Sequence, residues 1–287
     1  RDSNLIGSEM GTGKSLEAIA YAVQRNAKKI LVISTKSGVN ITWPDEINKH
    51  LSSNYEIIML RDSEQRNALS NKTEATRWLL ATYSFAARNA EWLRNQNLDL
   101  IILDESHKIN NDHSIQSRSL TSLDAPLKLA LSGSLFKNNR NELFSILNWA
   151  FPEDFPDMDT FHRKYCRNEE GLLRLQYELK KRMVVRMKNE VLRLPTINSL
   201  EESVAMTNKQ RGEYEAVEED FIKWYESHFK EISKLRGSVV LKKLHSLRKL
   251  AIQPKIPLIT ELLTEYVVRQ DRKGVLFTTY LDVLDQF

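Results

Sequence analysis

Short apolar runs separated by polar stretches characterise the first half of the chain. The runs are Ile30–Ser34, Glu56–Leu60, Leu79–Tyr83, Leu98–Leu103 and Pro126–Leu131. Several are continuous rather than alternating, which suits strands buried on both faces of a parallel sheet. The stretches Leu16–Asn26 and Ser114–Leu123 lie between runs and are predicted helices. The pattern therefore predicts an α/β lobe with a doubly wound parallel sheet.

The second half has a mainly helical pattern from Arg140 to about Ala251. Leu172, Leu175, Leu179 and Met183 recur at the three- and four-residue spacing of a helix. The segment Phe151–Asp159 contains two prolines and is a predicted loop, and Pro195 is predicted to end another helix.

A strand-like run returns near the end of the sequence. A helix is predicted over Leu258–Arg269, and Gly274–Thr279 then has the composition of a new buried strand. We therefore expect an α/β lobe over residues 1–150, a helical insert over 151–255 and the beginning of a second α/β lobe over 256–287.

The bulk composition is that of a globular protein, with 41% hydrophobic and 28% charged residues. No apolar run approaches the roughly 18 residues that span a bilayer, and a signal-peptide pattern is absent. The one cysteine, Cys166, excludes an internal disulfide and fits a reducing compartment. We expect no membrane partner and a cytoplasmic, nucleoid-associated protein, or a nuclear one in a eukaryote. Because the sequence starts at Arg1 and ends in a strand-like pattern, we expect a piece of a longer protein.

The net charge of +4 is unevenly distributed. Basic residues dominate positions 163–193 and recur over 230–255, with the acidic segment Glu213–Asp220 between them. Such stretches are typical either of solvated helix faces or of a nucleic-acid-binding surface, and charge alone leaves both open.

A glycine-rich segment precedes the first predicted helix. It consists of Gly7, Ser8, Glu9, Met10, Gly11, Thr12, Gly13, Lys14 and Ser15. Glycines let backbone N–H groups surround phosphate oxygens, a lysine neutralises their charge, and a serine hydroxyl can bind Mg²⁺. Residues 11–15 are therefore predicted to bind the phosphates of a nucleotide. The strict phosphate-loop pattern fails at its first position, Ser8, so a chance glycine-rich turn is the alternative.

Two acids, Asp104 and Glu105, follow the apolar run that ends at Leu103. A strand would deliver them to the carboxyl edge of the sheet, where α/β folds bind ligands. Asp104 is predicted to hold Mg²⁺ with Ser15, and Glu105 to orient or deprotonate an attacking water. The alternative is an ordinary strand–loop junction. Ser132, Gly133 and Ser134 follow another run, and alone they indicate only a turn.

In this order, the three segments resemble the ATPase core of superfamily-two helicases, and more narrowly the Swi/Snf family. Further segments similar to that family's motifs are Trp43 with Glu46, Leu131–Asn139, Met183–Lys188, Leu194 with Pro195, Leu247–Pro254 and Gly274–Thr279. The departures are mild: Ser8, Ser134, Leu135 and Ala251 stand where the family usually has Asp, Thr, Pro and Cys.

The resemblance implies RecA-like lobes and an ATP hydrolase that translocates on double-stranded DNA, with ATP and Mg²⁺ as cofactors. It assigns catalysis to Lys14, Asp104 and Glu105, and the coupling of nucleotide state to DNA grip to His107, Ser132, Gly133 and Ser134. Lys36, Ser37, Thr82 and Tyr83 lie near positions where the family touches the DNA backbone, and the alternative is that they are ordinary surface loop residues. DNA-bound proteins are a further expected class of partner.

Two other functions use the same motifs. One is a nucleotide-gated P-loop module that acts on a protein partner, and the other is a helicase that separates strands. The arginine fingers implied by the resemblance belong to the second lobe and are expected beyond Phe287, so the isolated chain is expected to hydrolyse ATP slowly.

Replacing either Lys14 by Ala or Glu105 by Gln is expected to abolish DNA-stimulated ATP hydrolysis in the intact protein, because each change removes one part of the catalytic arrangement. The Glu105→Gln variant should still bind ATP, since the phosphate loop is unchanged. Steady-state hydrolysis and nucleotide-binding titrations check this expectation, and normal turnover by either variant would refute the site assignment.

Overall fold

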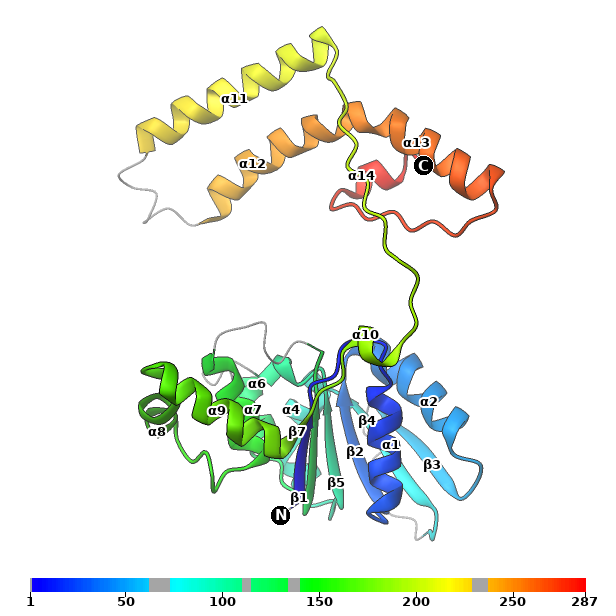
Figure 1. Cartoon of the computed structure of the whole chain (residues 1–287), viewed down its shortest axis with the longest axis vertical. Coiled ribbons are helices and arrows are strands. Elements are labelled where there is room, and N and C mark those ends of the chain that lie inside the picture. The colour runs from blue at the N-terminus through cyan, green and yellow to red at the C-terminus, as the bar shows by residue number, and fades with distance from the viewer. Residues whose placement is uncertain (1, 62–72, 110–114, 134–139, 229–236) are drawn as a thin grey trace. The chain divides into compact units, whose positions relative to one another are not determined.

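A computed structural model describes residues 2–61, 73–109, 115–133, 140–228 and 237–287. The chain divides into two compact units, Arg1–Pro195 and Thr196–Phe287, here called unit 1 and unit 2 (Figure 1). Within the described segments, no helix combines the length and the apolar character needed to cross a membrane.

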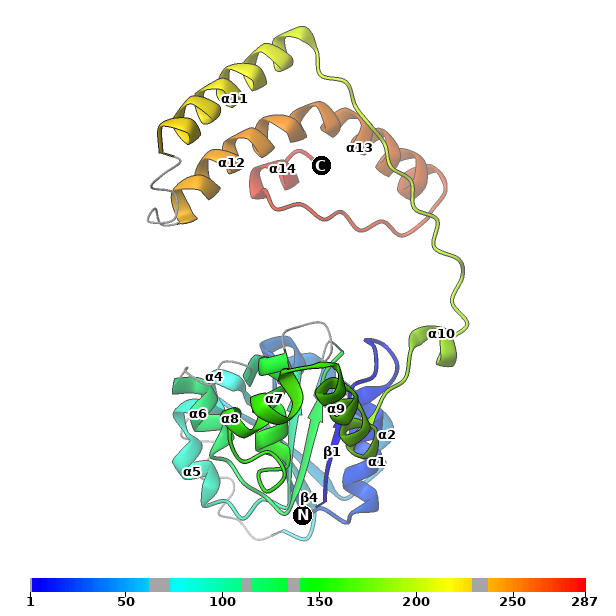
Figure 2. The ribbon, with the colours of Figure 1, turned by 60° about the vertical axis from the view of Figure 1, so that its left-hand side comes forward.

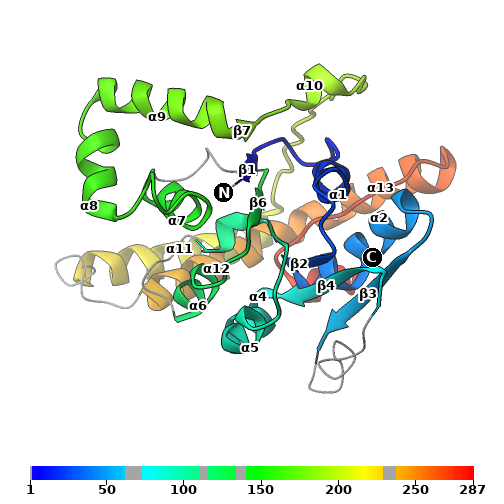
Figure 3. The same cartoon turned by 90° about the horizontal axis from the view of Figure 1, so that it is seen from below.

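Unit 1 is built on a single parallel sheet of seven strands, in the order β3-β4-β2-β5-β6-β1-β7. The strands are β1 (Asp2–Ile6), β2 (Lys29–Ser34), β3 (Tyr55–Leu60), β4 (Thr76–Thr82), β5 (Leu100–Asp104), β6 (Leu127–Leu131) and β7 (Met183–Val184). Figure 3 shows β3 at one edge of this sheet and β1 with β7 toward the other. The predicted parallel α/β architecture is confirmed.

Helices cover both faces of the sheet, which explains why the apolar runs are continuous. The helices in the described part of unit 1 are α1 (Lys14–Gln24), α2 (Trp43–His50), α4 (Tyr83–Arg88), α5 (Ala90–Arg94), α6 (Ile115–Thr121), α7 (Arg140–Ala150), α8 (Met158–Phe161), α9 (Glu169–Arg182) and α10 (Lys188–Val191). Short helical turns occur at Gly38–Thr42, Ser106–Ile109 and His162–Cys166.

Two hydrophobic cores result from the alternation of side chains along each strand. Ile30 and Val32 of β2 belong to the core that includes residues of α1 and α2. Leu31 and Ile33 belong to the other core, which includes residues of α4, α5, α6, α7 and α9. In Figure 1, α1 and α2 accordingly lie on one side of the sheet and α4, α6 and α7 on the other.

The segment 151–184 packs with unit 1 rather than forming a separate body. Phe161 contacts Phe144 of α7, with ring centroids 5.4 Å apart, and also Phe155 and Tyr165 at 6.1 and 5.3 Å. Figure 2 shows α7, α8 and α9 gathered on one side of the unit. The predicted division into parts 1–150, 151–255 and 256–287 stays a prediction, while the boundary between the compact units falls after Pro195.

Unit 2 consists of helices and extended chain in its described part. Its helices are α11 (Asn208–His228), α12 (Gly237–Ile252), α13 (Ile256–Leu263) and α14 (Leu281–Leu284), with a short helical turn at Gln253–Lys255 and a π-helical extension at Thr264–Arg269. Tyr280, just before α14, contacts His245 of α12 at a ring distance of 4.8 Å, and Lys249 pairs with Asp282 at 2.6 Å. These contacts hold α14 against α12.

The strand predicted over Gly274–Thr279 is wrong. This segment belongs to no sheet, and its side chains Val275 and Phe277 are 76% and 89% exposed. A strand requires a neighbour to satisfy its backbone groups, and the described residues of unit 2 include no strand. Gly274–Thr279 therefore has the composition of a buried strand but, among the described residues, no neighbouring strand to pair with.

The helical pattern also misplaced two boundaries. Met183 was expected on a helix face, but α9 ends at Arg182 and Met183 pairs with Leu5 of β1. The helix predicted to end at Pro195 ends earlier, at Val191, because the next residue, Leu192, has an extended backbone. The two-residue strand β7 depends on pairing with β1, and a local pattern does not contain that information.

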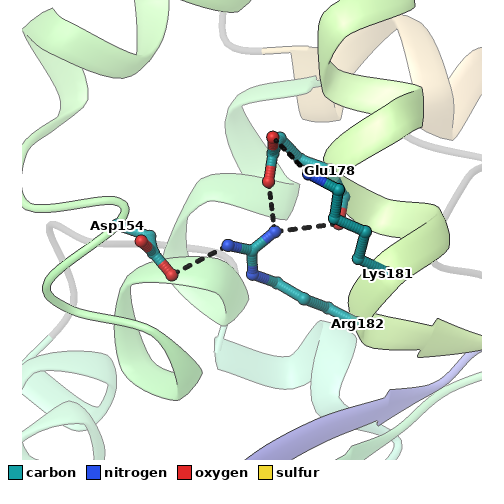
Figure 4. A network of polar contacts seen from close by, with 4 residues as sticks. All are labelled: Asp154, Glu178, Lys181 and Arg182. Atoms are coloured by element: carbon teal, nitrogen blue, oxygen red, sulfur yellow. Dashed lines mark hydrogen bonds and ion pairs between the residues drawn. The ribbon is translucent and has the colours of Figure 1, made fainter.

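Arg182 joins the last turn of α9 to the loop before α8 (Figure 4). Its guanidinium donates to Asp154 at 2.9 Å and also binds the Glu178 carboxylate. The guanidinium lies over the rings of Phe151 and Phe155, at 5.4 and 5.8 Å from their centroids. The hydrogen bond from Arg182 lowers the pKa of Glu178 below its ordinary value.

Replacing Arg182 by Met is expected to lower the free energy of unfolding by about 1–2 kcal/mol, because both ion pairs and the ring contacts are lost. The matched control is Arg174→Met, which breaks a solvent-exposed pair of the same spacing on the same helix, with Glu170, and should cost less than about 0.5 kcal/mol. Urea denaturation of both variants measures the difference.

The Arg182 contribution should also depend on acidity. Because the folded-state pKa of Glu178 is lowered, its stabilising effect is complete above the ordinary value of 4.5 and is lost as the pH falls through the lower folded value. The difference between wild type and Arg182→Met should therefore shrink at acid pH. Equal losses of unfolding free energy in Arg182→Met and Arg174→Met would contradict this role of the Arg182 contacts.

Candidate functional site

The predicted site residues gather at the carboxyl ends of five adjacent strands, in the spatial order β4, β2, β5, β6 and β1. Thr82 and Tyr83 stand at the end of β4, Lys36 and Ser37 follow β2, Asp104 and Glu105 stand at the end of β5, Ser132 and Gly133 follow β6, and the glycine-rich segment follows β1. Ser134 lies outside the described residues. The sheet thus brings Gly11 and Gly133, which are 122 residues apart in the sequence, to one edge.

The glycine-rich segment forms a turn at the start of α1. Gly11 and Gly13 have φ angles of 80° and 91°, a region that costs glycine nothing and other residues considerably more. Helix α1 begins at Lys14, whose Nζ donates to the backbone oxygens of Ser8 and Glu9 at 3.1 Å each. Free N–H groups at a helix N-terminus attract anions, and the lysine charge adds to this field.

The end of β5 holds the two acids in different ways. Asp104 Oδ2 accepts hydrogen bonds from Ser34 Oγ at 2.7 Å and from Trp43 Nε1 at 2.9 Å. Glu105 has a left-handed backbone, with φ at 54°. The other described non-glycine residues with positive φ are Asn or Asp, which tolerate that region better, so the strain at Glu105 is typical of a functional position.

The predicted coupling residues are close to the acids and to the phosphate loop. His107 Nδ1 lies 3.3 Å from Glu105 Oε2 and 3.5 Å from Ser132 Oγ. A Cβ atom on Gly133 would stand 3.5 Å from Lys14 Nζ, so β6 ends directly beside the lysine. The residues that follow β6 are therefore close to both Lys14 and the His107–Glu105 pair. A movement of the phosphate loop or of Glu105 would reach them directly.

One cavity of about 580 Å³ joins the phosphate loop to the acid pair. Its lining includes Gly11, Gly13, Lys14 and Ser15 from one side and Asp104 and Glu105 from another. Its size is that of an ordinary small-ligand site. Ser37 lines this cavity as well, together with Thr35 and Gly38.

The donor set at this cavity fits a Mg²⁺ ion bound with phosphates. Mg²⁺ favours oxygen ligands and usually takes only one or two carboxylates from the protein, completing its shell with water and phosphate. Ser15 supplies a hydroxyl and Asp104 a carboxylate whose second oxygen, Oδ1, has no donor within the described residues. No group of three or more His, Cys, Asp or Glu side chains in the described segments forms a self-contained metal site.

A second cavity, of about 650 Å³, lies at the ends of β2 and β4. It contains Lys36, Thr82 and Tyr83, and the basic side chains Arg61, Arg88 and Lys108 also line it. The described residues around it include no carboxylate. Sequence reasoning missed these three cations, although Arg61 directly follows β3 and could have been found by the rule that ligands bind at strand ends.

Tyr83, which the sequence predicts to contact DNA, is buried. It is 5% exposed, and its hydroxyl donates to the backbone oxygen of Asp104 at 2.7 Å. Burial, reinforced by the neighbouring carboxylates, raises the pKa of Tyr83 well above 10.0, so the phenol remains a neutral donor. The DNA-contacting roles of Tyr83 and Ser37 stay predictions.

The segment Arg186–Lys188, which the sequence alone does not connect to the site, forms hydrogen bonds with the phosphate loop. The backbone N–H of Arg186 donates to Ser8 Oγ at 3.1 Å, and that of Lys188 donates to Glu9 Oε2 at 2.6 Å. The Arg186 side chain also pairs with Glu17 of α1. Ser8, which departs from the usual motif, is thus used to bind this segment.

Comparison with known proteins identifies relatives along most of the chain. The family model described as SNF2-related domain matches residues 1–256. The yeast (Saccharomyces cerevisiae) ISWI chromatin-remodeling complex ATPase ISW1 is 30% identical over 55% of this chain and 15% of its own length. The human (Homo sapiens) chromodomain-helicase-DNA-binding protein 1 is 25% identical over 78% of this chain and 13% of its own length. The chain therefore spans a small part of the length of these relatives.

A solved structure has a similar fold. It is the Sulfolobus solfataricus SWI2/SNF2 ATPase core in complex with dsDNA, with a TM-score of 0.57 and 20% identity. The similarity covers 99% of this chain and 64% of that one. The fold of unit 1 is accordingly that of a RecA-like lobe.

Replacing Tyr83 by Phe is expected to lower the free energy of unfolding by about 1–2 kcal/mol, because a buried carbonyl loses its hydrogen bond. Tyr55→Phe is the matched control, since the Tyr55 hydroxyl bonds Asn48 at an exposed position and should matter little. As the folded-state pKa of Tyr83 is raised, its contribution should be constant up to about pH 10 and be lost above it. Urea denaturation at pH 7 and pH 9 checks that the contribution is constant over this range, and equal effects of the two variants would contradict the assignment.

Proposed function

The chain belongs to the SNF2-related domain family, and on that premise we propose that it is part of an ATP-dependent motor that translocates on double-stranded DNA. The observation that carries the proposal is the single cavity shared by Lys14, Ser15, Asp104 and Glu105. The basic cavity beside it supports the DNA-dependent part.

The nucleotide is bound through its phosphates in this proposal. The backbone N–H groups of Gly11, Gly13, Lys14 and Ser15, which line the cavity, and the Lys14 ammonium bind the phosphates, while Ser15 and Asp104 would hold Mg²⁺. The Thr12 N–H instead donates to Glu9 O at 3.4 Å. A bound Mg²⁺ neutralises charge on the phosphate oxygens. Glu105 orients the attacking water and accepts its proton, and His107 Nδ1 lies 3.3 Å from its carboxylate.

Coupling to DNA runs through residues that contact both the acids and the phosphate loop. His107 lies between Glu105 and Ser132, and Gly133 is beside Lys14. Loss of the γ-phosphate removes a charge next to Lys14, so the end of β6 is the first neighbouring element to experience the change. Ser134 is assigned to the same coupling role by its position in the sequence.

The DNA strand is bound through its phosphates at the second cavity. Lys36 and Thr82, predicted from the sequence, are accompanied there by Arg61, Arg88 and Lys108. Contacts of cations with backbone phosphates are independent of base sequence and sensitive to salt. Thr35 lines both cavities, so the proposed nucleotide and DNA sites meet at the end of β2.

At the level of the whole protein, the proposal extends to the parts predicted from the sequence. We keep the predicted parts: a first RecA-like lobe over 1–150, an insert over 151–255 with DNA-facing basic stretches, and the beginning of the second lobe from 256. The N-terminal part of the insert packs on the first lobe, and its β7 adds a strand to that lobe's sheet. DNA-bound proteins are the further partners, and the nucleoid or the nucleus is the location. The isolated chain hydrolyses ATP slowly, because the residues of the opposite lobe complete the site.

The proposal is tested by ATP hydrolysis with and without duplex DNA over a salt series. Hydrolysis by the intact protein should rise with duplex DNA and fall as salt increases. Lys36→Ala or Arg88→Ala should weaken duplex binding regardless of DNA sequence and lower the slope of log affinity against log salt by about 1. Lys28→Ala is the matched control, because Lys28 precedes β2 whereas Lys36 follows it, which puts Lys28 at the opposite end of the sheet.

The other outcomes separate the alternatives. Hydrolysis that ignores DNA at every salt concentration would favour a nucleotide-gated module with a protein partner. Release of a labelled strand from a duplex would favour a strand-separating helicase. Equal losses of duplex affinity in Lys28→Ala and Lys36→Ala would show that the second cavity is not part of the DNA-binding surface.

A further inference from the structure

The Asp104 carboxylate is held on one of its two oxygens by side chains from two other elements. Ser34, the last residue of β2, donates to Oδ2 at 2.7 Å, and Trp43, the first residue of α2, donates to the same atom at 2.9 Å. Rotation of the carboxylate about its bond to Cβ would break both hydrogen bonds. The pair therefore fixes which oxygen remains for a ligand.

Both donors are fully buried. Trp43 and Ser34 are each 0% exposed, and the Trp43 indole is part of the core that contains Val39 and Ile47. Moving this ring would open a void in a closely packed core. Hydrogen bonds in such an environment are stronger than at the surface, because water does not compete for the donors.

Gly38 leaves the space that the Ser34 hydroxyl occupies. A Cβ atom on Gly38 would stand 2.0 Å from Ser34 Oγ and 3.0 Å from Ser34 Cβ. Distances this short exclude a side chain at position 38 while Ser34 keeps its present conformation. Because the hydroxyl occupies the space that only glycine leaves open, Gly38 belongs to the same arrangement.

We propose that Trp43 and Ser34 are positioning residues that fix Asp104 Oδ2 and so reserve Oδ1 for the nucleotide-bound Mg²⁺. This inference rests on the proposed function, since it concerns the cation of the same site. Partners that orient a metal-binding group typically change metal affinity by about 10–100-fold when removed. The arrangement acts on the cation through Asp104 and leaves the phosphate loop unaffected.

The test is Mg²⁺-dependent binding of a fluorescent ADP analogue to the intact protein, which requires no turnover. In Trp43→Phe, the ring stays apolar but the N–H is lost, and the Mg²⁺ concentration for half-maximal binding should rise about 10-fold. Affinity for the analogue in EDTA should stay at the wild-type value, because the phosphate loop is unchanged. Ser34→Ala and Gly38→Ala should each shift the Mg²⁺ dependence in the same direction.

Trp78 provides a matched control. It is also 0% exposed, lies in the same core on β4, and its Nε1 has no hydrogen-bond partner within the described residues. Trp78→Phe therefore removes the same atoms without touching Asp104, and its Mg²⁺ dependence should equal that of wild type. Melting temperatures of all four variants separate loss of folding from loss of cation binding.

Three outcomes would overturn the inference. They are equal Mg²⁺ shifts in Trp43→Phe and Trp78→Phe, a loss of analogue affinity in EDTA as large as that in Mg²⁺, and unchanged Mg²⁺ dependence in both Trp43→Phe and Ser34→Ala. If Trp43→Phe fails to fold, Ser34→Ala alone decides. Nucleotide binding by wild type without any Mg²⁺ dependence would instead overturn the proposed function, and the inference with it.

Discussion

The register of the parallel strands is the constraint on which the site depends. Ile6 of β1 and Asp104 of β5 are both paired with Leu131 of β6, and Ile33 of β2 is paired with Leu103. The ends of these strands therefore stand in one row, about 4.8 Å apart from strand to strand. A slip of one residue in β5 would send the Asp104 side chain to the opposite face of the sheet and separate it from Ser34 and Trp43.

Much of this arrangement could be predicted because its signals are local. The continuous apolar runs of β2, β4 and β5 identify strands buried on both faces, and the two glycines before Lys14 identify a loop that needs positive φ at the start of a helix. The order of the motifs along the sequence then placed Lys14 and Asp104 at one edge. The two residues do line one cavity.

The parts that escaped prediction are those fixed by distant contacts. The hydrogen bond from Trp43 to Asp104, the pairing of β7 with β1 and the contact between Ser8 and Arg186 join segments that have no local pattern in common. Gly274–Thr279 illustrates the converse, since its composition suits a strand but the described residues of unit 2 offer it no partner. Composition identifies what a segment can form, and pairing decides whether it forms.

The backbone hydrogen bonds between the phosphate loop and the chain after β7 have a mechanical consequence. Gly7 N–H donates to Val184 O at 2.8 Å and Glu9 N–H to Arg186 O at 3.0 Å, just before the exposed residues 192–203, which lead out of unit 1. Tension applied through that tether would load these parallel bonds in shear and arrive first at the loop around Lys14. The loop around Lys14 is thus also the anchor point for any pulling force on the tether.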